Sequence, residues 1–267
     1  MDFSQLADIF KEALILTAVV VGIMLLVDLV RTYTGSLAES GIWKRKRWTV
    51  PVAALLGAIP GCIGGYVTVS LYDKRVVPFG AVMAMAIATM GDETFMMLAM
   101  FPKTAMIILA GAVVAGIVIG YACAAIKGND YKVSAPTGTV PDHEHTGWKH
   151  SLLHALKVSA WAFFAMLVIK IAGCYIDLEP LVTGNASILV VVAVLIGLIP
   201  VSGPHMIFVT MFAQGLLPLP VLIANCIVQE GHAGLPLIAS DKKAFVRMKL
   251  IKCILALAAG WLGLLFV

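Results

Sequence analysis

The chain has 267 residues, of which 61% are hydrophobic and only 13% are charged, and its formal net charge is +4. A soluble domain is nearer half apolar and a quarter charged, so this composition excludes an ordinary soluble protein. The basic residues are concentrated in a few loops, which excludes a nucleic-acid surface, and the lack of a P-loop pattern gives no indication of ATP as the energy source.

Apolar segments follow one another along the chain, and each is about long enough to cross the ~30 Å hydrocarbon core of a membrane as a helix. They cover residues 13–31, 49–72, 78–101, 105–126, 152–174, 186–212, 218–240 and 248–267. The second, third, sixth and seventh segments are interrupted by helix breakers: Pro60, Gly61, Gly91, Pro200, Gly203, Pro204 and Gly231. We therefore predict an all-α polytopic membrane protein with broken or re-entrant helices at the midplane.

The sequence also contains two copies of one unit. A shift of 140 positions places "IPGCIGGYVTVSLYDKRVVPFG" on "IPVSGPHMIFVTMFAQGLLPLP" without a gap, and it aligns Gly91 with Gly231. This predicts a first transmembrane repeat over residues 1–126, a histidine-containing linker over 127–147 and a second repeat over 148–267. Matching interruptions in the two halves of a membrane protein point to a transporter's binding site.

The charge of equivalent loops predicts that the two repeats are inverted. "WKRKRW" (43–48) is basic and is expected on the cytoplasmic side, as is "DKKAFVRMK" (241–249). The counterpart of the first loop, "YIDLEP" (175–180), is acidic and is expected outside. Equivalent loops lie on opposite faces only if each half crosses the membrane an odd number of times.

Polar side chains occupy the interruptions of the third and seventh segments. Asp92 and Glu93 lie in the first of these, and Glu230 and His232 lie in the second. A charged group at the midplane costs at least ~2.5–3.5 kcal/mol, so such groups face a protein interior or a water-filled cavity. We predict that these four side chains form a central metal and proton site, with neighbours that complete it: Gln229, His205, Ser202, Cys62 and Thr89.

Carboxylates combined with imidazole suit a divalent metal such as manganese, iron or zinc. Arsenite or copper(I) would require several thiolates, and only Cys62 and Cys226 lie near the interruptions. Alternative interpretations are a buried carboxylate that pairs with a lysine, a carrier of an anion, and an intramembrane protease that uses "MGDE" or Ser202 with His232. The linker offers accessory metal ligands, or an ordinary solvated loop, at His143, His145, His150 and His154.

The interrupted segments resemble the ten-helix heavy-metal exporter family, whose members are labelled manganese transporters or arsenic efflux proteins. The resemblance rests on "GAIPGCIGG", "VVPFGAVMAMAIATMGDETFMMLAMFPKTA", "VLIGLIPVSGPHMIFVTMFAQG" and "IVQEGHAGLPLIA". It implies a multi-pass exporter of a metal or metalloid in the bacterial inner membrane, and not an enzyme.

Together with the site residues, this resemblance leads us to expect proton-coupled secondary export of a divalent cation, with manganese favoured. The alternative substrates are arsenite, another anion or a small organic solute. The expected partners are the metal ion, protons and the lipid bilayer, with no nucleic acid, no tightly bound cofactor and a homodimer as one possible assembly.

The inverted arrangement can be tested by labelling. A cysteine introduced within 43–48 and one introduced within 176–180 should show opposite accessibility to an impermeant thiol reagent in intact cells, because the two loops are predicted on opposite faces. The same accessibility at both positions would contradict inverted repeats.

Overall fold

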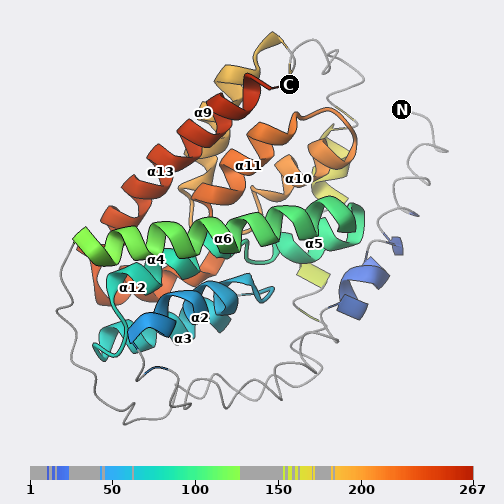
Figure 1. Cartoon of the computed structure of the whole chain (residues 1–267). Coiled ribbons are helices and arrows are strands. Elements are labelled where there is room, and N and C mark those ends of the chain that lie inside the picture. Colours follow the sequence, from blue (N-terminus) through green and yellow to red (C-terminus); the bar gives the residue numbers. More distant parts are fainter. Residues whose placement is uncertain are drawn as a thin grey trace.

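The structure is a computed structural model, and every regular element among its described residues is a helix (Figure 1). The described residues are 11, 14, 15, 17–23, 43, 46–61, 63–126, 153, 156, 157, 160, 161, 163–169, 171, 182 and 184–266. In the first half the helices are α2 (Lys46–Ala58), α3 (Ile63–Asp73), α4 (Phe79–Ala88), α5 (Glu93–Met100) and α6 (Pro102–Ile126). In the second half they are α9 (Ala186–Gly197), α10 (Met206–Ala213), α11 (Leu219–Val228), the short 3₁₀ helix η3 (Gly231–Gly234), α12 (Leu235–Ser240) and α13 (Lys242–Leu264).

All four predicted interruptions are confirmed. The second segment divides between α2 and α3, the third between α4 and α5, the sixth between α9 and α10, and the seventh between α11 and η3. Glycine is favoured at three of these points: Gly61 has a φ of 93°, and Gly91 and Gly231 adopt the left-handed φ values of 55° and 54°. Other residues reach this conformation only at an energetic cost.

The same backbone geometry recurs 140 positions apart. Helix α4 covers residues 79–88, and helix α11 covers residues 219–228, which are the positions 140 residues later. Both helices follow an extended proline, Pro78 or Pro218, and both end at an extended residue, Thr89 or Gln229. The same pattern of proline and glycine residues therefore produces the same extended interruption of a helix in each half. Whether the halves are inverted in the membrane stays a prediction.

Each half packs its broken helix against two further helices, which also contact each other. α4 packs against α2 and α6, and the equivalent α11 packs against α9 and α13 (Figure 1). Small residues allow the close approach of α4 and α6, because a Cβ atom at Gly116 would lie 2.6 Å from the carbonyl oxygen of Ala84. Close backbone packing through small residues is typical of membrane helices, where van der Waals contact replaces the hydrophobic effect between helices.

Burial distinguishes the broken helices from those that cover them. By length and composition, the described residues offer three helices able to cross a membrane: 79–100, 102–126 and 219–240. The most apolar window of the first is 94% buried and that of the third 67% buried, whereas that of 102–126 is only 17% buried. The interrupted backbone thus lies inside the protein, where protein groups can satisfy its free polar groups.

One sequence-based boundary was wrong. The basic stretch 241–249 was interpreted as a cytoplasmic loop, but helix α13 begins at Lys242 and continues through it. Asp241 caps this helix by accepting a hydrogen bond of 2.9 Å from the backbone N–H of Ala244. Lys249 belongs to the buried interior and not to a loop, so it carries no information about membrane orientation.

The two left-handed glycines can be tested by substitution. Gly91→Ala and Gly231→Ala should each cost about 1–2 kcal/mol through backbone strain, and Gly231→Ala should cost more because its Cβ would lie 2.8 Å from Ser202 Oγ. Gly111→Ala is the control, since no described atom apart from its chain neighbours and the backbone of its own helix lies within 4 Å of its Cβ position. Thermal unfolding in detergent should rank the control highest and Gly231→Ala lowest; equal stability of all three would contradict the assigned backbone geometry.

Candidate functional site

The helix interruptions meet at one place in the protein. A Cβ at Gly91 would lie 3.6 Å from the Cα of Gly231, and a Cβ at Gly231 would lie 3.7 Å from the Cα of Gly91. Ser202 lies against both glycines, and the N–H of Gly61 donates a hydrogen bond of 3.3 Å to the carbonyl oxygen of Gly91. The predicted convergence of the breaks is confirmed for these residues. The reciprocal contact of the two glycines is what a two-fold relation between the halves would produce.

Two carboxylates lie at the interruption of the first half. Glu93 is fully buried at the start of α5, and Asp92 is 2% exposed. Neither carboxylate oxygen of Glu93 forms a hydrogen bond with any described residue. An ionised carboxylate this deeply buried requires a cation or a proton to neutralise it, so Glu93 is a candidate to bind one or the other.

His232 connects this acidic pair with a more open region. Its Nδ1 atom lies 4.0 Å from Asp92 Oδ2, and its side chain is 39% exposed whereas that of Asp92 is 3% exposed. Asp92 and His232 are the repeat-equivalent residues that follow Gly91 and Gly231. The arrangement places an imidazole between the buried carboxylates and the protein surface.

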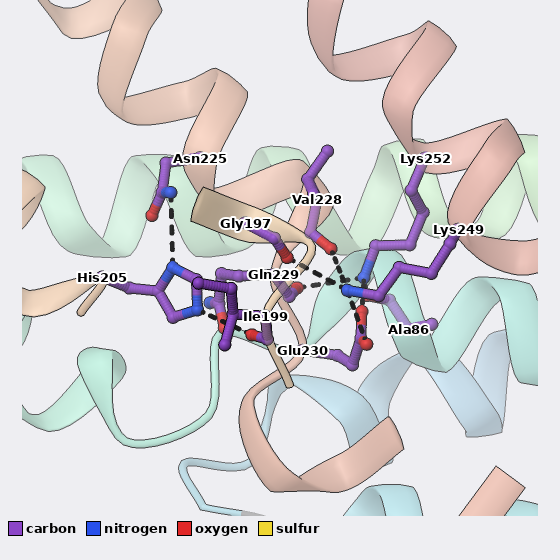
Figure 2. A network of polar contacts seen from close by, with 10 residues as sticks. All are labelled: Ala86, Gly197, Ile199, His205, Asn225, Val228, Gln229, Glu230, Lys249 and Lys252. Atoms are coloured by element: carbon purple, nitrogen blue, oxygen red, sulfur yellow. Dashed lines mark hydrogen bonds and ion pairs between the residues drawn. The ribbon is translucent and has the colours of Figure 1, made fainter. Parts of the chain in front are cut away.

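Glu230 belongs to a different electrostatic environment. Its Oε1 atom lies 2.7 Å from Lys249 Nζ and its Oε2 atom lies 2.8 Å from Lys252 Nζ (Figure 2). The carboxylate is 1% exposed and the two lysines are 6% and 0% exposed. Glu230 is therefore held in a buried ion-pair triad and is not an open carboxylate available to a metal. For this residue the alternative interpretation, a buried carboxylate that pairs with a lysine, is confirmed.

The two lysines also satisfy the ends of broken helices. Lys249 Nζ donates to the carbonyl oxygens of Gly197 at 3.0 Å and Val228 at 3.2 Å. Lys252 Nζ donates to the carbonyl oxygens of Ala86 at 2.7 Å and Gln229 at 2.9 Å. These carbonyls lie in the last turns, or at the C-cap, of α9, α11 and α4, where no intrahelical donor is available.

His205 has a structural role here. Its Nε2 lies 3.1 Å from the carbonyl oxygen of Ile199, which accepts the ring proton, and its Nδ1 accepts from Asn225 Nδ2 at 3.4 Å (Figure 2). Asn225 also donates to the carbonyl oxygen of Ala193 at 2.9 Å. With both ring nitrogens engaged, His205 fixes the irregular segment before α10 against α11 and offers no free nitrogen to a metal.

Three further predicted residues are buried at the interruptions. The side-chain amide of Gln229 and the hydroxyl of Ser202 form no hydrogen bond with described residues. Thr89 Oγ1 accepts a long hydrogen bond of 3.5 Å from the N–H of Gly91. These groups supply neutral oxygen atoms at the interruptions. Cys62 and the linker residues His143, His145, His150 and His154 lie outside the described residues.

The predicted shell of four ligands is not assembled in this structure. In the described part of the chain, no three His, Cys, Asp or Glu side chains lie close enough to hold a metal ion together. Asp92 and His232 come close, whereas Glu230 points to the lysines. The metal-binding role of these residues stays a prediction, and it no longer includes Glu230 as an unpaired ligand.

Sequence reasoning missed Lys249 and Lys252. They lie three positions apart in an apolar helix and thus share one face of α13. This spacing was the available signal, because two lysines on the buried face of a membrane helix require acidic or carbonyl partners. Glu230 was the partner that the sequence offered.

Comparison with known proteins agrees with a membrane transporter. A family model described as "Putative, 10TM heavy-metal exporter" matches residues 2–164 and 142–267, which together cover almost the whole chain. No curated protein and no solved structure matches.

The triad predicts that substitution by glutamine changes the stability of the protein differently at the two buried glutamates, Glu230 and Glu93. Glu230→Gln should destabilise the protein by about 3–5 kcal/mol, because it leaves two buried ammonium groups without their counter-charge. Glu93→Gln is the matched control and should retain or raise stability, since Glu93 loses no hydrogen bond to a described residue. Thermal unfolding in detergent measures both, and a Glu230→Gln variant as stable as the wild type would contradict the triad.

Proposed function

Because the chain belongs to the family of 10TM heavy-metal exporters, we propose that it exports a divalent metal cation by secondary transport. The observation that carries this proposal is the buried Glu93 carboxylate, whose two oxygens lack hydrogen-bond partners among the described residues. A cation or a proton is the missing partner that its burial requires. Asp92, adjacent in sequence and also buried, doubles the negative charge at this point.

The donor set favours a cation that accepts oxygen and imidazole ligands. Asp92 and Glu93 supply carboxylates, His232 supplies an imidazole, and Gln229, Ser202 and Thr89 supply neutral oxygens. Manganese-like ions accept such a mixed set. A small number of strong ligands also suits a transported ion, which must bind well enough to enter and weakly enough to leave.

Proton coupling is the second part of the proposal. Ligand carboxylates and imidazole must lose their protons before they bind a metal, so metal and protons compete for the same side chains. With Glu93 fully buried, the carboxylate would alternate between a metal-bound and a protonated state. Outward movement of the metal and return in the protonated form would constitute antiport across a bacterial inner membrane.

The lysines argue against the alternative of an anionic substrate. An anion carrier requires free N–H donors or basic side chains at the midplane. The ammonium groups of Lys249 and Lys252 each donate to two carbonyl oxygens and each lie within ion-pair distance of one oxygen of Glu230. Lys252 therefore uses all three N–H donors of its ammonium group. Lys249 donates two hydrogen bonds and meets Glu230 Oε1 as an ion pair without a hydrogen bond. Both ammonium groups are thus engaged by buried protein groups, which disfavours their use by an anion.

A thiolate site for arsenite has similarly little support. Of the three described cysteines, Cys226 is buried, and Cys123 and Cys253 are partly exposed. One buried thiol cannot provide the several thiolates that soft metals and metalloids prefer. A serine protease is not favoured either, because Ser202 Oγ forms no hydrogen bond with a described residue and so makes no dyad with His232.

Export can be measured as ⁵⁴Mn²⁺ accumulation in inside-out membrane vesicles under an imposed proton gradient. Asp92→Asn and Glu93→Gln should each lower the rate at least ~10-fold, because losing a charged ligand costs about 1.5–3 kcal/mol and 1.4 kcal/mol is tenfold. Asp73→Asn at the exposed end of α3 is the control and should transport normally. Wild-type rates in both site variants, with normal expression, would refute the assignment.

A further inference from the structure

The triad has a second property that the proposed export does not use. Four backbone carbonyl oxygens and two carboxylate oxygens converge on two points, and each point is occupied by a lysine ammonium group. Figure 2 shows both side chains extending from α13 to the same carboxylate. Each ammonium group thus has three oxygen neighbours; those of Lys252 all accept hydrogen bonds from it, whereas Glu230 Oε1 meets Lys249 as an ion pair only.

Such a group of oxygen atoms has the composition of a cation-binding site, with a lysine ammonium group in the place of a free cation. The C-terminal ends of helices carry partial negative charge and favour cations. In transporters built from broken helices, unwound carbonyls and half-helix C-termini coordinate the coupling ion. Here Ala86, Gly197, Val228 and Gln229 supply such carbonyls, and Glu230 adds a full negative charge.

We propose that Lys249 and Lys252 are tethered cations that occupy a coupling-ion site, and that the site binds a small free cation when a lysine side chain is removed. Lys252 is the critical one because it is fully buried and joins the two halves. It donates to Ala86 in the first half and to Gln229 and Glu230 in the second. The ligand class is a primary ammonium ion, which can make the same three N–H bonds.

The first half does not contain this arrangement. Under the shift of 140 positions, Lys249 and Lys252 correspond to Leu109 and Ala112, and Glu230 corresponds to Met90. Glu230 and its two lysines are thus absent together from one half and present together in the other. This joint occurrence supports a single site with a built-in occupant.

The inference has a consequence for coupling, which rests on the proposed export function. If the chain's own ammonium groups fill the cation site, no exchange of Na⁺ or K⁺ occurs there during the transport cycle. Manganese export by the wild type should then proceed at the same rate in sodium, potassium or choline buffer. A Lys252→Ala variant should lose export and recover it when a suitable cation fills the site.

Lys252→Ala provides the direct test because it removes three carbons and the nitrogen, which are the non-hydrogen atoms of propylammonium. Its melting temperature should fall by roughly 6 °C or more, given about 3–5 kcal/mol for an uncompensated buried charge and 2–4 °C per kcal/mol. Propylammonium should restore at least half of this loss. Tetramethylammonium, which has no N–H donor, and neutral 1-propanol should not.

Controls separate a specific site from a general salt effect. The exposed Lys243, also on α13, is the matched position, and Lys243→Ala should show no response to propylammonium. Lys249→Ala provides a second version of the test, because its site has the same composition and is slightly more accessible. Lys252→Met keeps the volume without the charge and should remain less stable than the wild type.

The outcomes are distinguishable. Rescue of Lys252→Ala or Lys249→Ala by propylammonium alone supports the tethered-cation site, whether or not manganese is transported. The proposal is wrong if neither variant responds, if tetramethylammonium is equally effective, or if Lys252→Met matches the wild type. A wild type that does not export manganese would refute the proposed function and leave the thermal test of the site intact.

Discussion

The fold depends on hydrogen-bond donors for the backbone carbonyl groups that are left unpaired where helices break inside the apolar interior. Each unsatisfied backbone group in such surroundings costs several kcal/mol. Lys249 and Lys252 meet this requirement at the ends of α4, α9 and α11, and Glu230 balances part of their charge. The same triad connects α13 with the ends of α4, α9 and α11, so it joins the two halves at the point where both are interrupted.

Equivalent backbones carry different chemistry in the two halves. The breaks at Gly91 and Gly231 share one conformation and contact each other. The first half places Glu93, which has no hydrogen-bond partner among the described residues, beside Asp92. The second half places Glu230, which is paired with lysines, beside a partly exposed His232. The shared backbone conformation thus brings the two interruptions together, and different side chains give the first half a buried acidic pair and the second half a carboxylate paired with two lysines.

The sequence was sufficient to locate the interruptions, because glycine and proline change the backbone locally and a 140-residue shift aligns them. It was also sufficient to predict that Asp92 and His232 approach each other. It did not decide between a metal ligand and a structural partner for Glu230 and His205, because their roles depend on partners far away in the chain. These partners are lysines 19 and 22 positions later for Glu230, and Asn225 for His205. A charged residue near a predicted helix end looks the same in sequence whether it lies in a loop or faces the interior, and only packing distinguishes the two for Lys249.

The central claim is that the metal binds the carboxylates of the first half while the lysines retain Glu230. The most direct measurement is the position of the manganese anomalous peak in crystals of the full chain grown with Mn²⁺. The account predicts a peak about 2–2.6 Å from a carboxylate oxygen of Asp92 or Glu93, with Glu230 still paired to Lys249 and Lys252. A peak bonded to Glu230, with the lysines displaced, would contradict it.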